Sequence, residues 1–116
     1  MIDEERICIC VAEGHDLGAP FDPRFGRAPT FLLTNRGGTA VEVVDNPGAD
    51  AASGAGARAA NLMGSLGVKH VVAGHFGPKA ERGLVAAGAA MWLAPEGLTA
   101  AEVLARFTAG ELIPHR

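Results

Sequence analysis

The sequence predicts an α/β protein in which a mixed sheet carries helices on both faces. Two observations lead to this fold class. Short apolar runs and amphipathic stretches follow one another in the order β-β-β-α-β-α-β-α. An initial meander followed by alternating units implies antiparallel neighbours first and parallel crossovers later. The length of 116 residues, with 48 % hydrophobic and 20 % charged side chains, fits one domain that is large enough for a core.

The first half of the chain supplies the meander. Residues 6–12 form a short apolar run with β-branched side chains, which predicts a buried strand. Residues 13–29 form a long loop with proline and glycine, and such a loop in a compact domain is usually functional or partly disordered. The second and third strands are expected over residues 30–35 and 40–45, joined by a hairpin turn.

The second half supplies the alternating units. A helix is expected from Gly54-Ala55-Gly56 to about residue 66, closed by Gly67. Strand 68–74 has a continuous apolar centre, which is typical of a strand covered on both faces. Pro78 opens a second helix that ends near residue 88, and residues 89–93 form the fifth strand.

The last helix begins with a predicted capping box, in which Thr99 and Glu102 bond reciprocally, and it ends at Gly110. Residues 111–116 are expected to fray.

Charge and composition exclude several classes of function. A formal net charge of −3 argues against non-specific binding to nucleic acid or to an anionic membrane. No apolar run approaches the roughly 20 residues needed to span a bilayer. The acidic start, residues 1–6, lacks the features of a signal peptide, and two cysteines do not make a secreted disulfide framework. A cytoplasmic location is therefore predicted.

The stretch from Phe21 to Pro29 is the most informative part of the chain. It holds two arginines, two aromatic residues, a glycine and two prolines within nine residues, so it is a shaped loop. The guanidinium groups of Arg24 and Arg27 are permanently charged forks that suit anions. The alternative is a rigid connector whose arginines pair with nearby carboxylates. Both interpretations remain open at this point.

Ligands of open α/β sheets bind beyond the carboxyl ends of the parallel strands. Besides the arginine loop, the helix starts near Gly54, Gly56 and Gly77 are expected there, and helix starts present unpaired N–H groups. Together these segments predict a concave anion pocket, without a match to a known nucleotide fingerprint. His75 directly follows a strand, where it suits a metal-ligand or proton-transfer role. The alternative is a polar side chain that faces solvent or caps the helix.

Other candidate sites are weaker. Cys8 and Cys10 lie two residues apart on the first strand, so both thiols face one side and could bind a soft metal. Burial as small hydrophobic residues is favoured, because no further ligands complete a zinc site. No Gly-x-Ser-x-Gly elbow is present, and the first strand has no carboxylate for a metal-dependent nuclease. Arg58, Lys79 and Arg82 are interpreted as solvated helix faces.

Five motifs follow one another along the chain. They are Glu13-Gly14-x-Asp16-Leu17, the arginine loop through Phe31, Asn46-Pro47, Gly54-Ala55-Gly56 and Ala73-Gly74-x-x-Gly77-Pro78-x-Ala80. In this order and spacing they resemble the dinitrogenase iron–molybdenum cofactor biosynthesis family, which includes small proteins similar to NifX and to the C-terminal domain of NifB. The resemblance covers roughly residues 6–110 of a single domain, 1–116.

The resemblance implies a three-layer α/β/α fold with a ribonuclease H-like motif and a five-stranded mixed sheet containing one antiparallel strand. It also implies a non-catalytic protein that binds and passes on an iron–sulfur or molybdenum-containing cluster, or its precursor, bound transiently. A metallocluster donor or acceptor protein would be the partner. Arg24 and Arg27 would neutralise cluster charge, Gly54, Gly56 and Gly77 would offer N–H groups, and His75 would be the direct metal ligand.

A metal-free regulatory or protein-interaction module is the main alternative function, and a ribonuclease H-like enzyme is the weaker one. The family position of His75 is most often asparagine, and the positions of Cys8 and Cys10 are usually apolar. Involvement in nitrogen fixation itself is not implied.

Overall fold

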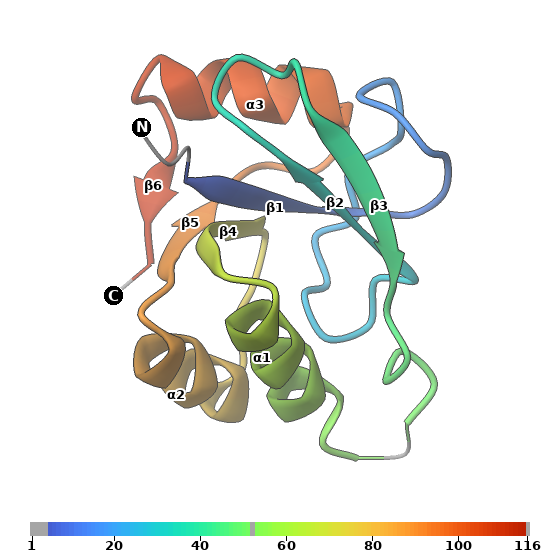
Figure 1. Ribbon diagram of the computed structural model, residues 1–116, viewed down its shortest axis with the longest axis vertical. Coiled ribbons are helices and arrows are strands. Elements are labelled where there is room, and N and C mark those ends of the chain that lie inside the picture. Colours follow the sequence, from blue (N-terminus) through green and yellow to red (C-terminus); the bar gives the residue numbers. More distant parts are fainter. Residues whose placement is uncertain (1–4, 52, 116) are drawn as a thin grey trace.

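The computed structural model describes residues 5–51 and 53–115, so residues 1–4 of the predicted acidic start lie outside the described residues. The chain forms a mixed sheet with three helices (Figure 1). The elements in chain order are β1 (Arg6–Val11), β2 (Thr30–Thr34), β3 (Val41–Asp45), α1 (Ala55–Ser65), β4 (Val68–Ala73), α2 (Pro78–Ala87), β5 (Ala90–Leu93), α3 (Ala100–Thr108) and β6 (Ile113–Pro114).

The sheet has six strands in the order β3-β2-β1-β4-β5-β6, so the prediction of five strands with one antiparallel strand is wrong. Strand β1 pairs in parallel with β4, and β4 with β5, whereas β2 and β6 each run antiparallel to their neighbours. The extra strand lies in the tail that was expected to fray. It is held because Leu112 is buried and the backbone N–H of His115 donates to the carbonyl of Met91 at 3.0 Å.

The helices divide between the two faces of the sheet, with α1 and α2 on one face and α3 on the other (Figure 1). Strand β1 alternates accordingly. Cys8 and Cys10 pack toward α1 and α2, while Ile7 and Ile9 pack toward α3. Both cysteines are free thiols with no exposed surface, so the core interpretation is confirmed. The Cys10 thiol interacts with the side chain of Cys8 and is buried, and both effects raise its pKa.

Small residues bring α1 and α2 close together. A Cβ atom added at Gly83 would lie 2.6 Å from the Cβ of Ala60, and one added at Gly56 would lie 3.1 Å from the Cβ of Ala80. The first of these distances is too short for any side chain larger than hydrogen. Close packing of the two helices therefore places their N-termini side by side at one edge of the domain.

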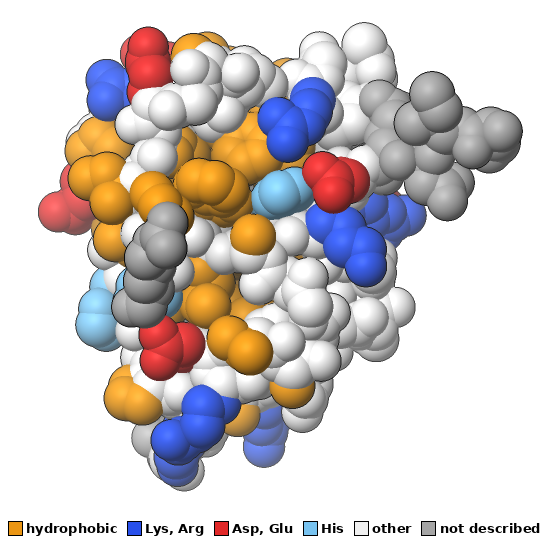
Figure 2. Space-filling model, turned by 90° about the vertical axis from the view of Figure 1, so that its left-hand side faces the viewer, with side chains coloured by type: hydrophobic (Ala, Val, Ile, Leu, Met, Phe, Trp, Pro, Cys, Tyr) orange, Lys and Arg blue, Asp and Glu red, His pale blue; other side chains and the backbone are white. Residues whose placement is uncertain are grey.

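The C-terminal strand β6 lies at an apolar edge of the sheet. Figure 2 shows hydrophobic side chains gathered on the side of the molecule that carries β6, where Ile113 is 66 % exposed. Pro114 suits this position because proline cannot donate to a further strand. In the part of the chain that the structure describes, no helix has the length and apolar content required to cross a membrane.

Candidate functional site

All six residues predicted to form the site line one pocket of about 560 Å³. The pocket lies where the segments that follow β1, β3 and β4 meet. The six residues are Arg24, Arg27, Gly54, Gly56, His75 and Gly77. The structure therefore brings together side chains and helix starts that are more than 50 residues apart in the sequence.

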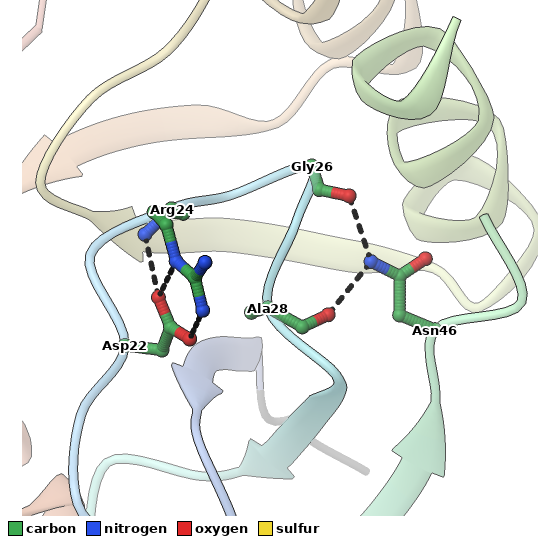
Figure 3. A network of polar contacts seen from close by, with 5 residues as sticks. All are labelled: Asp22, Arg24, Gly26, Ala28 and Asn46. Carbon is green, nitrogen blue, oxygen red and sulfur yellow. Dashed lines mark hydrogen bonds and ion pairs between the residues drawn. The ribbon is translucent and has the colours of Figure 1, made fainter. Parts of the chain in front are cut away.

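The arginine loop owes its shape to Asp22, whose buried carboxylate accepts three hydrogen bonds from Arg24 (Figure 3). The donors are the backbone N–H at 2.9 Å, Nε at 3.0 Å and Nη2 at 2.7 Å. These hydrogen bonds hold the pKa of the Asp22 carboxyl below its ordinary value, against the opposing effect of burial. For Arg24, the alternative of pairing with a nearby carboxylate is thus confirmed.

Asn46 ties this loop to the segment that leads into α1. Its Nδ2 donates to the carbonyls of Gly26 and Ala28 at 3.0 and 2.8 Å, as Figure 3 shows. Its Oδ1 accepts from the backbone N–H of Gly48. Arg27 adds a second tie, because its Nη1 donates to the carbonyls of Ala49 and Ala51. Arg27 is exposed, and among the described residues no carboxylate forms an ion pair with its guanidinium.

Close backbone contacts complete the wall of the pocket. A Cβ atom at Gly26 would lie 2.9 Å from the backbone nitrogen of Gly56, so only glycine lets the arginine loop approach α1 this closely. On the other side, the N–H of Gly74 donates to the carbonyl of Pro23 at 2.8 Å. The side chain of Phe25 is buried and anchors the loop in the core, with its ring centroid 5.5 Å from that of Phe76.

Both helices that open into the pocket begin with glycine. Gly54 has φ of +76°, which favours glycine, and Gly77 has extended φ and ψ that any residue can adopt. Neither residue makes a side-chain cap, so the first N–H groups of α1 and α2 have no side-chain acceptor from their own N-cap. A Cβ atom at Gly77 would meet nothing within 4 Å, so glycine keeps space open there.

Sequence reasoning missed two cations at this site. Lys79 and Arg82 are exposed, as the solvated interpretation expects, and both also line the pocket. The available signal was their spacing: they are three residues apart in the first turns of a helix whose start was already expected at the pocket. His75 lines the pocket as an exposed side chain and also borders a neighbouring hollow of about 410 Å³ that includes Glu96.

The donor set of the pocket determines which ligands fit it. As far as the structure describes the chain, its lining contains four cationic side chains, one histidine and two helix starts, but no carboxylate and no thiol. Within residues 5–51 and 53–115, no group of three or more His, Cys, Asp or Glu side chains could hold a metal ion. The pocket therefore suits an anion held by charge and N–H donors, with His75 the only lining side chain that can coordinate a metal.

Two of the three other histidines, His70 and His115, have structural contacts. His70 accepts from Nε1 of Trp92 through Nδ1 and lies 2.8 Å from a carboxylate oxygen of Glu5 through Nε2. His115 lies 2.9 Å from Glu81 and packs against Phe76. Neither histidine lines the pocket.

A family model and several solved structures match this chain. The profile of the family described as dinitrogenase iron-molybdenum cofactor matches residues 5–110. The apo form of the orange protein from Desulfovibrio gigas is 34 % identical, with a TM-score of 0.88 over 98 % of each chain. A Thermotoga protein described as a candidate NifB protein is 33 % identical, with a TM-score of 0.81 over 95 % of this chain and 92 % of that one. No curated protein matches the chain significantly.

Proposed function

Since the chain belongs to the dinitrogenase iron-molybdenum cofactor family, we propose that it binds an anionic metallocluster, or a precursor of one, in this pocket. One observation carries the proposal above all others. Two uncapped helix starts, an arginine loop and a histidine converge on one pocket, and no carboxylate of residues 5–51 or 53–115 lines it. Such surroundings favour an anion through partial charges, N–H donors and fixed cations.

Each predicted residue has a distinct role in this proposal. The backbone around Gly54, Gly56 and Gly77 would donate N–H hydrogen bonds to sulfide or other anionic atoms of the cargo. Arg27 would contribute positive charge, whereas the charge of Arg24 is already offset by Asp22 and contributes less. His75 would supply one bond to metal. A single histidine cannot build a cluster, so the cargo must arrive with its other ligands in place.

The same proposal includes transient carriage between a donor and an acceptor protein, without catalysis, in the cytoplasm. A pocket open to solvent and built from non-covalent contacts releases its cargo more readily than a set of thiolates would. The ribonuclease H-like assignment of the fold belongs to this proposal as well. A metal-free interaction module would use the same surface, and cargo binding is the property that separates the two functions.

The test is anaerobic uptake of a defined cluster source. The protein is incubated with tetrathiomolybdate or, separately, with ferrous iron and sulfide, and then passed over a sizing column. We expect visible absorbance that elutes with the protein in a fixed ratio. The His75→Ala variant should lose most of this absorbance, while the control variant His15→Ala should keep it, because His15 is exposed and lies outside the pocket.

Two results would count against this function. Absence of stoichiometric uptake from both sources would favour the metal-free interaction module. Equal uptake by His75→Ala and wild type would remove the ligand role of His75 and leave an anion cradle of backbone and cationic groups.

A further inference from the structure

We propose that the mouth of the pocket docks an acidic protein surface, and that Lys79 and Arg82 on α2 are its principal contacts. This proposal rests on the proposed function, because the partner would deliver or receive the cargo at the mouth of the pocket. The chemistry of the surface itself follows from the distribution of charge on the chain.

Several basic side chains gather around the pocket. The chain has ten lysines and arginines and a formal net charge of −3. Among the residues that the structure describes, four basic side chains line the pocket, and no aspartate or glutamate does. An acidic protein therefore presents a local basic surface around its pocket, and such a patch attracts an anionic partner by complementary potential.

The four cations are not equivalent. Arg24 is held by Asp22, and Arg27 donates to backbone carbonyls, so both help to shape the arginine loop. Lys79 and Arg82 are exposed, and among the described residues neither takes part in an ion pair. These two side chains are therefore free to pair with groups outside the chain.

Their position on α2 is unfavourable for the isolated protein. The helix begins at Pro78, so Lys79 and Arg82 lie in its first two turns, where the macrodipole is already positive. Residues three apart in a helix lie on the same side, so the two charges reinforce each other. A partner that presents carboxylates at the mouth would relieve this repulsion, whereas no carboxylate in the described part of the chain lines the pocket.

A folded acidic protein fits this arrangement better than a nucleic acid does. The cations line one hollow of about 560 Å³, whereas a phosphate backbone is typically followed by a basic stripe. A partner that docks over the hollow would cover the cargo during handover.

The test uses a short fluorescein-labelled peptide rich in glutamate as a probe of the full-length protein. Fluorescence anisotropy measures binding to wild type and to two double variants of equal charge change. One variant is Lys79→Glu with Arg82→Glu. The matched control is Lys69→Glu with Arg106→Glu, because both of these residues are exposed and lie away from the pocket.

We expect the pocket variant to weaken peptide binding about tenfold and the control variant to weaken it less than about twofold. Binding to wild type should also weaken as salt rises from about 0.01 M to about 1 M, over which the Debye length falls from about 30 Å to about 3 Å. Equal losses in the two variants would overturn the docking surface, because the peptide would then sense only net charge. No binding of the peptide to wild type at low salt would overturn it as well.

Uptake of tetrathiomolybdate by wild type, measured without peptide, keeps the two proposals apart. If peptide binding discriminates between the variants and uptake is absent, the docking surface stands and the cargo function fails. If uptake is present and the variants do not differ, the cargo function stands and the docking surface is wrong.

Discussion

The first N–H groups of a helix have no acceptor within the helix, and α3 differs from α1 and α2 in whether its N-cap side chain supplies one. In α3 the hydroxyl of Thr99 accepts from the N–H of Glu102, whose carboxylate accepts from the N–H of Thr99. In α1 and α2 the corresponding residues are Gly54 and Gly77, which have no side chain to offer. The capped helix covers the far face of the sheet, and the two uncapped ones open into the pocket.

The glycine N-caps of α1 and α2 lack a stabilising hydrogen bond that the N-cap of α3 makes. A good N-cap is worth about 1 kcal/mol relative to alanine, and a glycine loses a few tenths relative to the best caps. Glycine at both pocket helices leaves N–H donors available for an outside acceptor. The α3 start satisfies its own donors, and the α1 and α2 starts are suited to a ligand.

The largest expected effect comes from closing the gap between the arginine loop and α1. Gly26→Ala would place a Cβ atom 2.9 Å from the backbone of Gly56, which forces the loop away from the helix. We expect a loss of about 1–3 kcal/mol in the free energy of unfolding together with lost cargo uptake. Urea denaturation measures the first and column-bound absorbance the second. Gly37→Ala is the control, since its Cβ atom would lie 3.8 Å from the side chain of Thr39; equal losses in both variants would contradict the account.

The next effect concerns the pH dependence that Asp22 gives to the same loop. Arg24 lowers the pKa of Asp22 in the folded state. The contribution of Asp22 to the free energy of unfolding is therefore fully present above its unfolded pKa of about 3.9, and it is lost as the pH falls through the folded pKa. Denaturation curves collected from neutral pH downward should show this acid loss in wild type. Asp22→Asn should flatten it, leaving a smaller slope to which Glu5 contributes, because His70 lowers the pKa of Glu5. An unchanged acid slope would mean that the Asp22–Arg24 pair does not form in solution.

A smaller effect is expected at the capped helix. Thr99→Ala removes the capping box and should cost about 1 kcal/mol in the free energy of unfolding, without change in cargo uptake. Thermal unfolding and absorbance titration would measure the two quantities on the same sample. A loss of uptake comparable to that of Gly26→Ala would show that α3 also serves the pocket.

The smallest effect on stability, with the opposite sign, is expected at the start of α2. Gly77→Asp adds a side-chain cap at a position with suitable backbone angles and open space, and should stabilise the fold by about 0.3–1 kcal/mol. The same carboxylate would occupy the N–H donors and repel an anion, so cargo uptake should fall. A variant that is more stable and binds cargo as wild type does would refute the role of this helix start.

Most of the fold follows from local patterns. Glycine and proline positions mark the turns, apolar runs mark the strands, and Thr99 with Glu102 marks the last helix start. The edge strand β6 was missed because two residues, one of them Pro114, carry no periodicity, and its pairing with β5 is a tertiary property. Sequence alone could not place it in the sheet.

The site was predicted in outline but not in its internal bonds. Arginine, glycine and histidine at the ends of expected strands identified the pocket, because the carboxyl ends of parallel strands meet at one edge. The pairing of Asp22 with Arg24 could have been anticipated, since an aspartate often bonds the backbone two residues on. The ties made by Asn46 and the pocket-lining positions of Lys79 and Arg82 depend on long-range packing that local patterns do not encode.

The comparison of helix starts is tested most directly by backbone amide NMR during an anaerobic titration with tetrathiomolybdate. We predict that the largest shifts of amide resonances occur at Gly54, Gly56 and Gly77 and at their immediate helical neighbours. The first turn of α3, residues 100–103, should remain unshifted because its N–H groups are capped or remote from the pocket. Shifts of equal size at α3, or saturable binding that leaves the α1 and α2 starts unshifted, would contradict the central claim that uncapped helix starts hold the cargo.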